Sequence, residues 1–347
     1  MLGKLLIRAD ASVAMGTGHV MRCLALAQAW QDAGGQAVVA AAELTETIRA
    51  RVLSEGCEIA AVAGTPGGVE DATHTVAIAR EQDAAWVAVD GYHFDGAYEQ
   101  AIKSAGLKLL WLADDGLDRL CQADFILNQN FDASESMYPQ RAPHTRLLLG
   151  LRFVLLRREF RAWSTLRRAA SPEVRKILVS MGGSDPDNVT GLVIDALRMV
   201  KISDWQATVV AGGSNPHFEE LQRQSAAADG LKIRLERSVF NMPELISNAD
   251  LAIIAAGGTL WEMLYLACPV LSFGRDPLQR RILDALQSHG IVRHLGDPRA
   301  MEPAGVAEAM DELSSSHSER ARMATLGREQ VDGEGAKRVA DLLAGSI

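Results

Sequence analysis

The chain has 347 residues, of which 48% are hydrophobic and 23% are charged. This composition is typical of a soluble globular protein, and the length indicates two domains rather than a single core. The net charge of −9 at pH 7 disfavours non-specific binding to nucleic acid or to a membrane surface, because both need an excess of basic residues.

Several other classes of protein are also not expected. The four cysteines form no C-x-x-C pair and the histidines show no metal-ligand spacing, so neither a disulfide framework nor a zinc site is indicated. The start of the chain lacks a signal-peptide pattern, and no apolar run reaches the length of about 18 residues that a membrane span needs. We therefore expect a cytoplasmic protein with no metal, no cofactor and no stable membrane insertion. The oligomeric state stays open, with a monomer as one option.

The first half of the chain alternates strand-like apolar runs with helical patterns. Several of these runs are apolar without alternation, which is typical of strands buried on both faces of a parallel sheet. The predicted strands cover 4–8, 36–42, 86–90, 108–113, 124–127 and 146–149.

The second half repeats this pattern after an arginine-rich segment that ends at Ser171-Pro172. We expect a Rossmann-like domain over 1–155, a linker over 156–173 and a second domain over 174–347, whose last helix could pack back onto the first domain. Two doubly wound parallel-sheet α/β domains facing a cleft are the architecture called GT-B. The predicted strands of the second domain cover 176–180, 207–211, 232–235, 250–255, 270–273 and 291–295.

His19 lies where the first predicted strand gives way to a glycine-containing loop and then a helix. Ligands of open α/β sheets bind at such carboxyl ends of strands. The helix N-terminus favours a neutral imidazole, which can accept a proton from water. On this interpretation Asp10 could orient His19 or bind a sugar, and Arg22 could contact a phosphate or fix a carboxylate. A structural histidine is the alternative.

Two glycine loops of the second domain also follow strands and open helices. One contains Gly182, Gly183, Ser184 and Asp185, and the other contains Gly257, Gly258, Thr259 and Glu262. Free backbone N–H groups there could hold a diphosphate. Glycine turns with good helix caps are the alternative, but two such loops in one domain favour a nucleotide site.

Further polar residues follow other strands of the first domain. Tyr92 could stack on or hydrogen-bond a sugar, and the Asn128–Asn130 segment offers amides for hydroxyl or N-acyl groups. Asp114 and Asp115 could also belong to the site, but paired acids in a loop are usually turn residues or caps.

Motifs in several of these stretches occur in a fixed order. They are G-x-G-H-x-x-R-C-L-x-L-A from Gly16, V-D-G-Y from Val89, L-N-Q-N from Leu127, M-G-G-S-D-P-x-N-x-T from Met181 and G-G-T-L-W-E from Gly257. Together they resemble the PseG-like UDP-sugar hydrolases of pseudaminic acid biosynthesis, a GT-B superfamily group acting on UDP-2,4-diacetamido-2,4,6-trideoxy-β-L-altropyranose. The resemblance extends from about Leu5 to Phe273.

The resemblance implies metal-independent hydrolysis, in which water attacks the anomeric carbon and UDP leaves. His19 matches the catalytic histidine of the family, with Gly18 and Arg22 in the same motif. UDP would lie on the loops at 182–184 and 257–259 with Glu262 on its ribose, while Tyr92, Asn128 and Asn130 would face the sugar. The loop after Phe273 departs from the family, because only Gln279 is a plausible equivalent of the expected N-Q pair.

The hypothesis is therefore a UDP-sugar hydrolase that releases an N-acylated deoxysugar for pseudaminic acid or related surface-glycan synthesis, such as flagellin glycosylation. A GT-B glycosyltransferase with a UDP-sugar donor is the first alternative, with His19 deprotonating an acceptor hydroxyl. A nucleotide-sugar binding protein without catalysis is the second. The identity of the sugar stays open.

Overall fold

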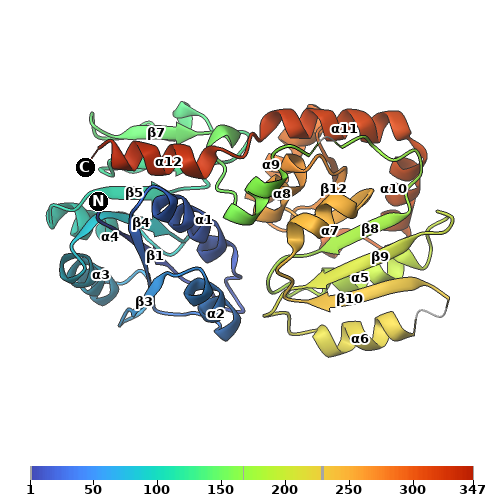
Figure 1. The fold of residues 1–347 in the computed structure, drawn as a ribbon, viewed down its shortest axis with the longest axis horizontal. Coiled ribbons are helices and arrows are strands. Elements are labelled where there is room, and N and C mark those ends of the chain that lie inside the picture. The colour runs from blue at the N-terminus through green and yellow to red at the C-terminus, as the bar shows by residue number, and fades with distance from the viewer. Residues whose placement is uncertain (1, 167, 228–229, 347) are drawn as a thin grey trace. The chain divides into compact units, whose positions relative to one another are not determined.

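The computed structural model describes residues 2–166, 168–227 and 230–346. The chain divides into two compact units, one formed by residues up to Arg158 together with those from Gly333 onward, and the other by Glu159–Asp332. Each unit contains one sheet whose strand pairs are all parallel, with helices packed against it (Figure 1). This α/β architecture confirms the fold class predicted from the alternation of strand and helix patterns.

The first unit is built on a sheet with the topology of a doubly wound fold. In spatial order its strands are β3 (Glu58–Ala61), β2 (Gln36–Ala41), β1 (Lys4–Ala9), β4 (Ala84–Asp90), β5 (Leu109–Leu112), β6 (Phe125–Asn128) and β7 (Arg146–Leu149). Its helices are α1 (Gly18–Asp32), α2 (Glu46–Ser54), α3 (Val69–Glu81), α4 (Gly96–Ser104) and α12 (Gly335–Ala344), with short 3-10 turns η1 (Glu135–Met137) and η2 (Leu151–Phe153). The edge strand β3 was not predicted; Ile59, Ala60 and Ala61 form a short apolar run, but none of the four residues of the strand is fully buried.

The second unit repeats this topology. Its strands follow the spatial order β10 (Lys232–Arg237), β9 (Gln206–Ala211), β8 (Lys176–Ser180), β11 (Leu251–Ala255), β12 (Val270–Phe273) and β13 (Arg293–Gly296). Its helices are α5 (Val189–Leu197), α6 (Phe218–Ala226), α7 (Met242–Asn248), α8 (Gly258–Tyr265), α9 (Pro277–Ser288), α10 (Pro303–Ser315) and α11 (His317–Gln330), with 3-10 turns η3 (Arg158–Trp163) and η4 (Pro298–Ala300).

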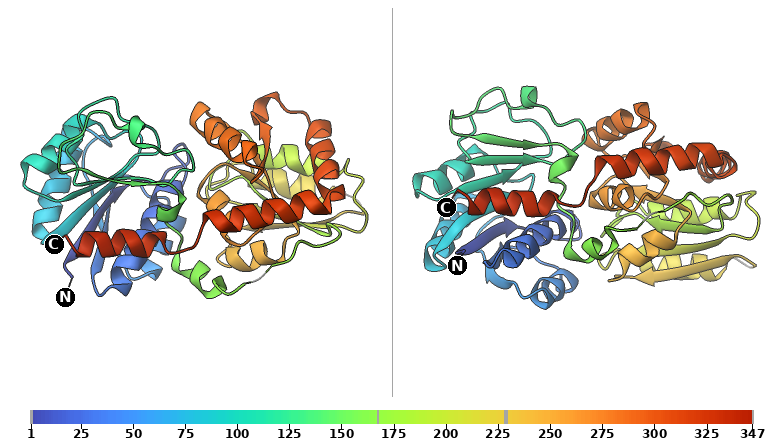
Figure 2. Two further views of the ribbon diagram at one scale, coloured as in Figure 1. Left: turned by 90° about the horizontal axis from the view of Figure 1, so that it is seen from above. Right: turned by 45° about the horizontal axis from the view of Figure 1, so that its top comes forward.

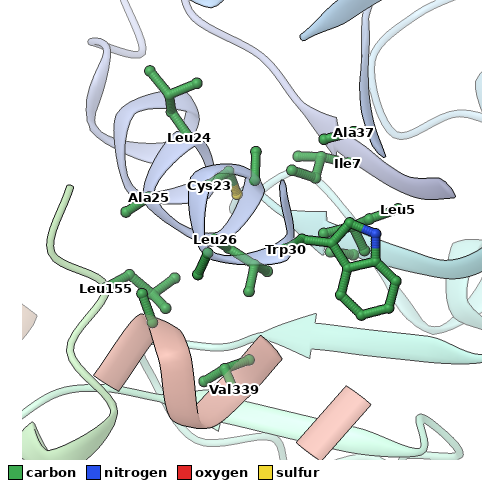
Figure 3. Packing of buried hydrophobic residues seen from close by; sticks show 14 of the residues in the cluster. Leu5, Ile7, Cys23, Leu24, Ala25, Leu26, Trp30, Ala37, Leu155 and Val339 are labelled. Atoms are coloured by element: carbon green, nitrogen blue, oxygen red, sulfur yellow. The ribbon is translucent and has the colours of Figure 1, made fainter. Parts of the chain in front are cut away.

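Strand β1 shows why its sequence is apolar without alternation. Leu5 and Ile7 belong to the core cluster on the face covered by α1 and α12 (Figure 3). Leu6 belongs to the cluster on the opposite face, which contains residues of α3 and α4. Because helices cover both faces of the strand, both sets of side chains must be apolar.

The last helix, α12, completes the core of the first unit although it follows the whole of the second unit in sequence. Figure 2 shows it alongside the elements of the first unit. Val339 and Leu343 are fully buried in the same cluster as α1, and Trp86 Nε1 donates a hydrogen bond to the Leu343 carbonyl at 3.0 Å.

Replacing Leu343 with Ala is expected to reduce the free energy of unfolding of the first unit by about 2–5 kcal/mol, because the truncation leaves a cavity in a close-packed core. Urea denaturation followed by tryptophan fluorescence, which includes the buried Trp86, would measure this loss. Lys337→Ala is the matched control on the exposed face of the same helix and should change stability by less than about 0.5 kcal/mol. Equal effects of the two substitutions would contradict the docking of α12.

The order of the strands reverses direction at one place in each sheet. In the first unit this occurs between β1 and β4, and in the second between β8 and β11. Crevices outside the carboxyl ends of strands form at such switch points. His19 follows β1, and the two glycine loops of the second unit follow β8 and β11, so the predicted chemistry lies at these positions. No helix among the described residues is long and apolar enough to cross a membrane.

Candidate functional site

His19 is presented by a tight turn between β1 and α1. The turn closes with hydrogen bonds from Gly16 N to the Ser12 carbonyl at 2.9 Å and from Met15 N to Ser12 Oγ at 3.2 Å. Helix α1 then begins at Gly18, and its N-cap Thr17 provides no side-chain hydrogen bond. His19 is therefore in the first turn of a helix, and its side chain is largely buried.

The imidazole of His19 is oriented by Asp90, the last residue of β4. His19 Nδ1 lies 2.7 Å from Asp90 Oδ1. An ionised carboxylate can only accept hydrogen bonds, so Nδ1 must carry the proton of a neutral imidazole. Nε2 is then the basic nitrogen, and the described part of the chain records no hydrogen bond to it.

Arg22, one turn further along α1, fixes two carboxylates. Its Nε and Nη2 donate to the two oxygens of Asp90, each at 2.6 Å, and its Nη1 donates to Asp114 Oδ1 at 2.6 Å. Burial opposes the charge of Asp90, but the charge of Arg22 and the hydrogen bonds from Arg22 and His19 hold its pKa well below the ordinary range. Of the two roles predicted for Arg22, the structure shows the fixing of carboxylates.

Tyr92 lies over the same group. Its hydroxyl donates to Asp114 Oδ2 at 3.0 Å, and its ring meets that of His19 edge-on with the centroids 4.8 Å apart. Tyr92 is nevertheless 71% exposed, so its ring offers an aromatic surface beside His19. Asn130 Nδ2 donates to the backbone carbonyl of Asp114 at 3.0 Å, so Asn130 supports the residue that Tyr92 and Arg22 contact.

Two predicted substrate contacts have structural tasks instead. Asp10 does not orient His19: it is fully buried, its Oδ1 accepts the N–H groups of Ala42 and Glu43, and Arg8 lies beside its Oδ2. Asn128 is also fully buried; its Nδ2 donates to the Asp114 carbonyl and to Tyr138 Oη, and its Oδ1 accepts the Asn130 N–H. Both lie at strand ends, where the sequence pattern alone does not distinguish an exposed from an inward-facing side chain.

In the second unit, the loop after β8 exposes glycine backbone and buries its acid. Gly182 has a positive φ of 86° and is exposed, while Ser184 and Asp185 are buried. Asp185 accepts the N–H groups of Val189 and Thr190 at 2.9 and 2.8 Å, and burial raises its pKa. Asp185 therefore caps the start of α5 in place of its predicted role as a ligand contact. Gly182 and Gly183 remain candidates for binding the nucleotide.

The loop after β11 leaves the start of α8 uncapped. The N-cap Gly257 offers no side-chain hydrogen bond. Gly257 and Gly258 are exposed, and a Cβ at either would meet nothing within 4 Å. Thr259 is half-buried in the first turn, and Glu262 is buried within the helix. Open backbone N–H groups at a helix N-terminus favour an anion.

Gln279 has a local task in the divergent loop after β12. Its Oε1 accepts the backbone N–H of Arg275 at 3.0 Å, and its own N–H donates to the N-cap Asp276 at 2.8 Å. The side-chain oxygen thus orders this loop. Among the described residues no group of three or more His, Cys, Asp or Glu side chains could hold a metal ion.

The sequence pattern indicates no specific role for Asp90 and favours a turn residue at Asp114. Both are buried acids that follow apolar strands at or beside the switch point. Their position in the sequence could have identified them as site residues. An acidic side chain at the end of a buried strand needs a positively charged or hydrogen-bonding partner. The partner, Arg22, is distant in sequence.

Curated proteins include relatives of this chain. A UDP-2,4-diacetamido-2,4,6-trideoxy-β-L-altropyranose hydrolase of Campylobacter jejuni is 24% identical over 76% of this chain and 88% of its own length. The spore coat polysaccharide biosynthesis protein SpsG of Bacillus subtilis is 28% identical over 64% of each chain. An uncharacterised protein of Methanocaldococcus jannaschii is 26% identical over 81% of this chain but only 57% of its own length. No family model matches the chain.

Solved structures share the fold. MurG of Acinetobacter baumannii has a TM-score of 0.66 at 17% identity, and covers 99% of both chains. Anabaena HepE, solved in complex with UDP and glucose, has a TM-score of 0.63 at 14% identity, covering 99% of this chain and 100% of its own. The curated relatives confirm the predicted resemblance to the PseG-like hydrolases, and the solved structures confirm the predicted fold.

Proposed function

We propose that this chain, a PseG-like protein with the GT-B fold, hydrolyses a UDP-activated N-acylated deoxysugar to the free sugar and UDP. Two relatives support this proposal by name, since one is a UDP-sugar hydrolase and the other a polysaccharide biosynthesis protein. Pseudaminic acid or a related surface glycan, including one attached to flagellin, is the proposed destination of the product.

The observation that carries the proposal is the His19–Asp90 hydrogen bond. It leaves Nε2 free to accept a proton from water as the water oxygen bonds to the anomeric carbon. The bond from that carbon to the diphosphate oxygen breaks, and UDP leaves with the electron pair. Diphosphate needs little help to leave, so a base together with a preorganised anion site is sufficient. The mechanism requires no metal.

The second unit supplies the proposed UDP site. The uncapped N-terminus of α8 at Gly257–Thr259 would hold the diphosphate, with Gly182 and Gly183 alongside. Glu262 is proposed to contact the ribose. Gln279 keeps the loop at Arg275 in place, and this loop is where the sugar preference would differ from that of the relatives.

The decisive experiment is incubation of the protein with a panel of UDP-sugars, with EDTA present and no acceptor. The anomeric proton is followed by NMR and UDP release by chromatography. We expect release of UDP and free sugar from at least one N-acylated deoxysugar nucleotide. Release that requires an added acceptor would indicate a glycosyltransferase, and tight binding without turnover would indicate a binding protein; either contradicts the proposal.

Gly212→Ala is expected to weaken UDP binding by about tenfold or more, equivalent to about 1.4 kcal/mol. A Cβ at Gly212 would lie 2.1 Å from the Gly183 carbonyl oxygen, so the glycine loop after β8 must move. Isothermal titration with UDP measures the change. Gly305→Ala is the control, since its Cβ would meet only the flexible end of Met301 at 3.3 Å; equal affinities of the two variants would argue against this site.

A further inference from the structure

A charged cluster is buried in the first unit and takes no part in the proposed reaction. Arg8, Asp10 and Asp71 are each 0% exposed. Arg8 Nε and Nη2 donate to the two oxygens of Asp71 at 2.9 and 2.5 Å, and its Nη1 lies 2.7 Å from Asp10 Oδ2. Two carboxylates face one guanidinium, so the cluster has an excess negative charge. Charges buried in this way are costly unless each is compensated.

The carboxylate of Asp10 faces the imidazole of His93. Asp10 Oδ1 is occupied by the N–H groups of Ala42 and Glu43. Asp10 Oδ2 lies 3.2 Å from His93 Nε2, and neither atom has an aligned hydrogen-bond partner among the described residues. Burial opposes the charge of Asp10, but the neighbouring His93 and Arg8 lower its pKa to about 2. The carboxylate is therefore a permanent acceptor for an N–H of the imidazole.

The rest of His93 is held by close packing. Its ring lies against that of Phe94 with the centroids 4.0 Å apart, and its side chain is only 20% exposed. A Cβ at Gly91 would lie 2.7 Å from His93 Cε1, and a Cβ at Gly67 would lie 2.3 Å from the His93 carbonyl oxygen. His93 therefore fits closely against Gly91 of its own loop and Gly67, which precedes α3.

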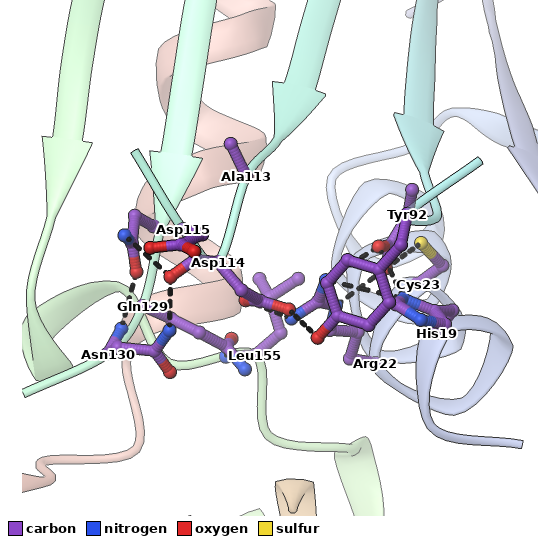
Figure 4. A network of polar contacts seen from close by, with 12 residues as sticks. His19, Arg22, Cys23, Tyr92, Ala113, Asp114, Asp115, Gln129, Asn130 and Leu155 are labelled. Atoms are coloured by element: carbon purple, nitrogen blue, oxygen red, sulfur yellow. Dashed lines mark hydrogen bonds and ion pairs between the residues drawn. The ribbon is translucent and has the colours of Figure 1, made fainter. Parts of the chain in front are cut away.

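The preceding residue, Tyr92, is held much less firmly. It is 71% exposed, and among the described residues its side chain makes a hydrogen bond to Asp114 and an edge contact with His19 (Figure 4). His93 and Tyr92 are adjacent, yet one is anchored in the buried cluster and the other lies over the imidazole of His19. Anchoring of the first restricts the backbone that carries the second.

We propose that His93 is a positioning residue: its imidazole, held between Asp10 and Phe94, fixes the loop so that Tyr92 lies edge-on against His19. The proposal deepens the proposed function, since Tyr92 lies beside the proposed base. The positioning itself needs no substrate and can be tested in the ligand-free protein.

The first test is side-chain NMR of His19, whose ring resonances feel the ring current of Tyr92. Tyr92→Leu defines the shift that follows from loss of this ring. We expect His93→Leu to move the His19 signals toward the same positions. His93→Gln should leave them near the wild-type positions, because an amide nitrogen on the longer side chain can replace Nε2. The exposed His144→Gln is the control.

Wild-type His19 signals in His93→Leu, together with shifted ones in Tyr92→Leu, would overturn the proposal. If His93→Leu does not fold, His93→Gln and His93→Asn decide. The shorter Asn does not reach Asp10, so its His19 signals should move while those of the Gln variant stay. Similar spectra for these two variants would also overturn it.

The second test is a double-mutant cycle on turnover of the UDP-sugar. His93→Leu should lower kcat/KM by about 10- to 100-fold, since small misplacements at a reacting centre have effects of this size. Adding Tyr92→Leu should cause little further loss; independent, multiplying losses would refute action through Tyr92. If the wild type turns over no UDP-sugar, the proposed function fails, while the NMR result still decides the role of His93.

Discussion

Replacing His19 with Asn is expected to lower kcat by at least 10²–10⁴-fold, the usual contribution of a positioned general base. Turnover should become undetectable while UDP affinity stays within about twofold of the wild type. The reason is the division of tasks: His19 follows β1 in the first unit, whereas the proposed UDP loops belong to the second. Single-turnover kinetics and isothermal titration with UDP measure the two quantities.

His144→Asn is the matched control for His19→Asn. His144 is exposed, and its Nε2 contacts only the carbonyl of Gln122 among the described residues, so this variant should keep wild-type turnover. An active His19→Asn enzyme would refute the assignment of the base. A large loss of UDP affinity in the same variant would instead indicate that His19 binds the nucleotide.

Asp90→Asn should damage both catalysis and stability. The amide can donate to Nδ1 of His19, which moves the imidazole proton to Nε2 and removes the base, so we expect kcat to fall by roughly 10³-fold or more. Arg22 would also lose its bidentate partner in a buried site, at a cost of about 3–5 kcal/mol. Kinetics, urea denaturation and the nitrogen shifts of His19 report these effects separately.

Asp114→Asn separates the expected effect of Asp90→Asn on catalysis from its effect on stability. It also deprives Arg22 of a carboxylate, so a loss of stability is expected here as well. The His19–Asp90 hydrogen bond remains, however, and the tautomer of His19 should not change. A fall in kcat as large as that of Asp90→Asn would contradict the orienting role of Asp90.

The pH dependence of stability offers an independent check on Asp90. The charge of Arg22 and the hydrogen bonds from Arg22 and His19 lower its pKa in the folded protein, whereas in the unfolded chain it is about 3.9. A carboxylate with a depressed pKa stabilises the fold above the unfolded value, and this stabilisation is lost as the pH falls below it. The difference in unfolding free energy between wild type and Asp90→Asn should therefore shrink below about pH 4. A difference that stays constant from pH 6 to pH 3 would contradict the depressed pKa.

Much of the fold could be predicted because parallel strands covered on both faces have a strong local signature. Leu5, Leu6 and Ile7 form an uninterrupted apolar run since helices pack against both sides of β1. The edge strand β3 was not predicted: its apolar run consists mainly of alanines, and its residues are exposed or only partly buried. The other edge strands, β7, β10 and β13, were nevertheless predicted, at 146–149, 232–235 and 291–295.

The candidate site was less predictable, because its geometry depends on residues distant in sequence. Asp10 was the obvious partner for His19, being nine residues earlier at a strand end, but its carboxylate points into the buried cluster with Arg8. The true partner, Asp90, is 71 residues away. Asp90 lies next to His19 in space because β4, which ends at Asp90, pairs directly with β1, which precedes His19.

Local sequence patterns specify the two doubly wound units, the glycine loops after β8 and β11, and the position of His19 at a strand-to-helix junction. These features follow from local periodicity and from residues whose conformational preferences are intrinsic. The tertiary structure alone decided which carboxylate orients His19, that Arg22 fixes Asp90 and Asp114, and that Asp10, Asn128 and Asp185 are internal. The physical reason is that the direction of a side chain at a strand end, and the charge it meets there, depend on which strands are neighbours in the sheet.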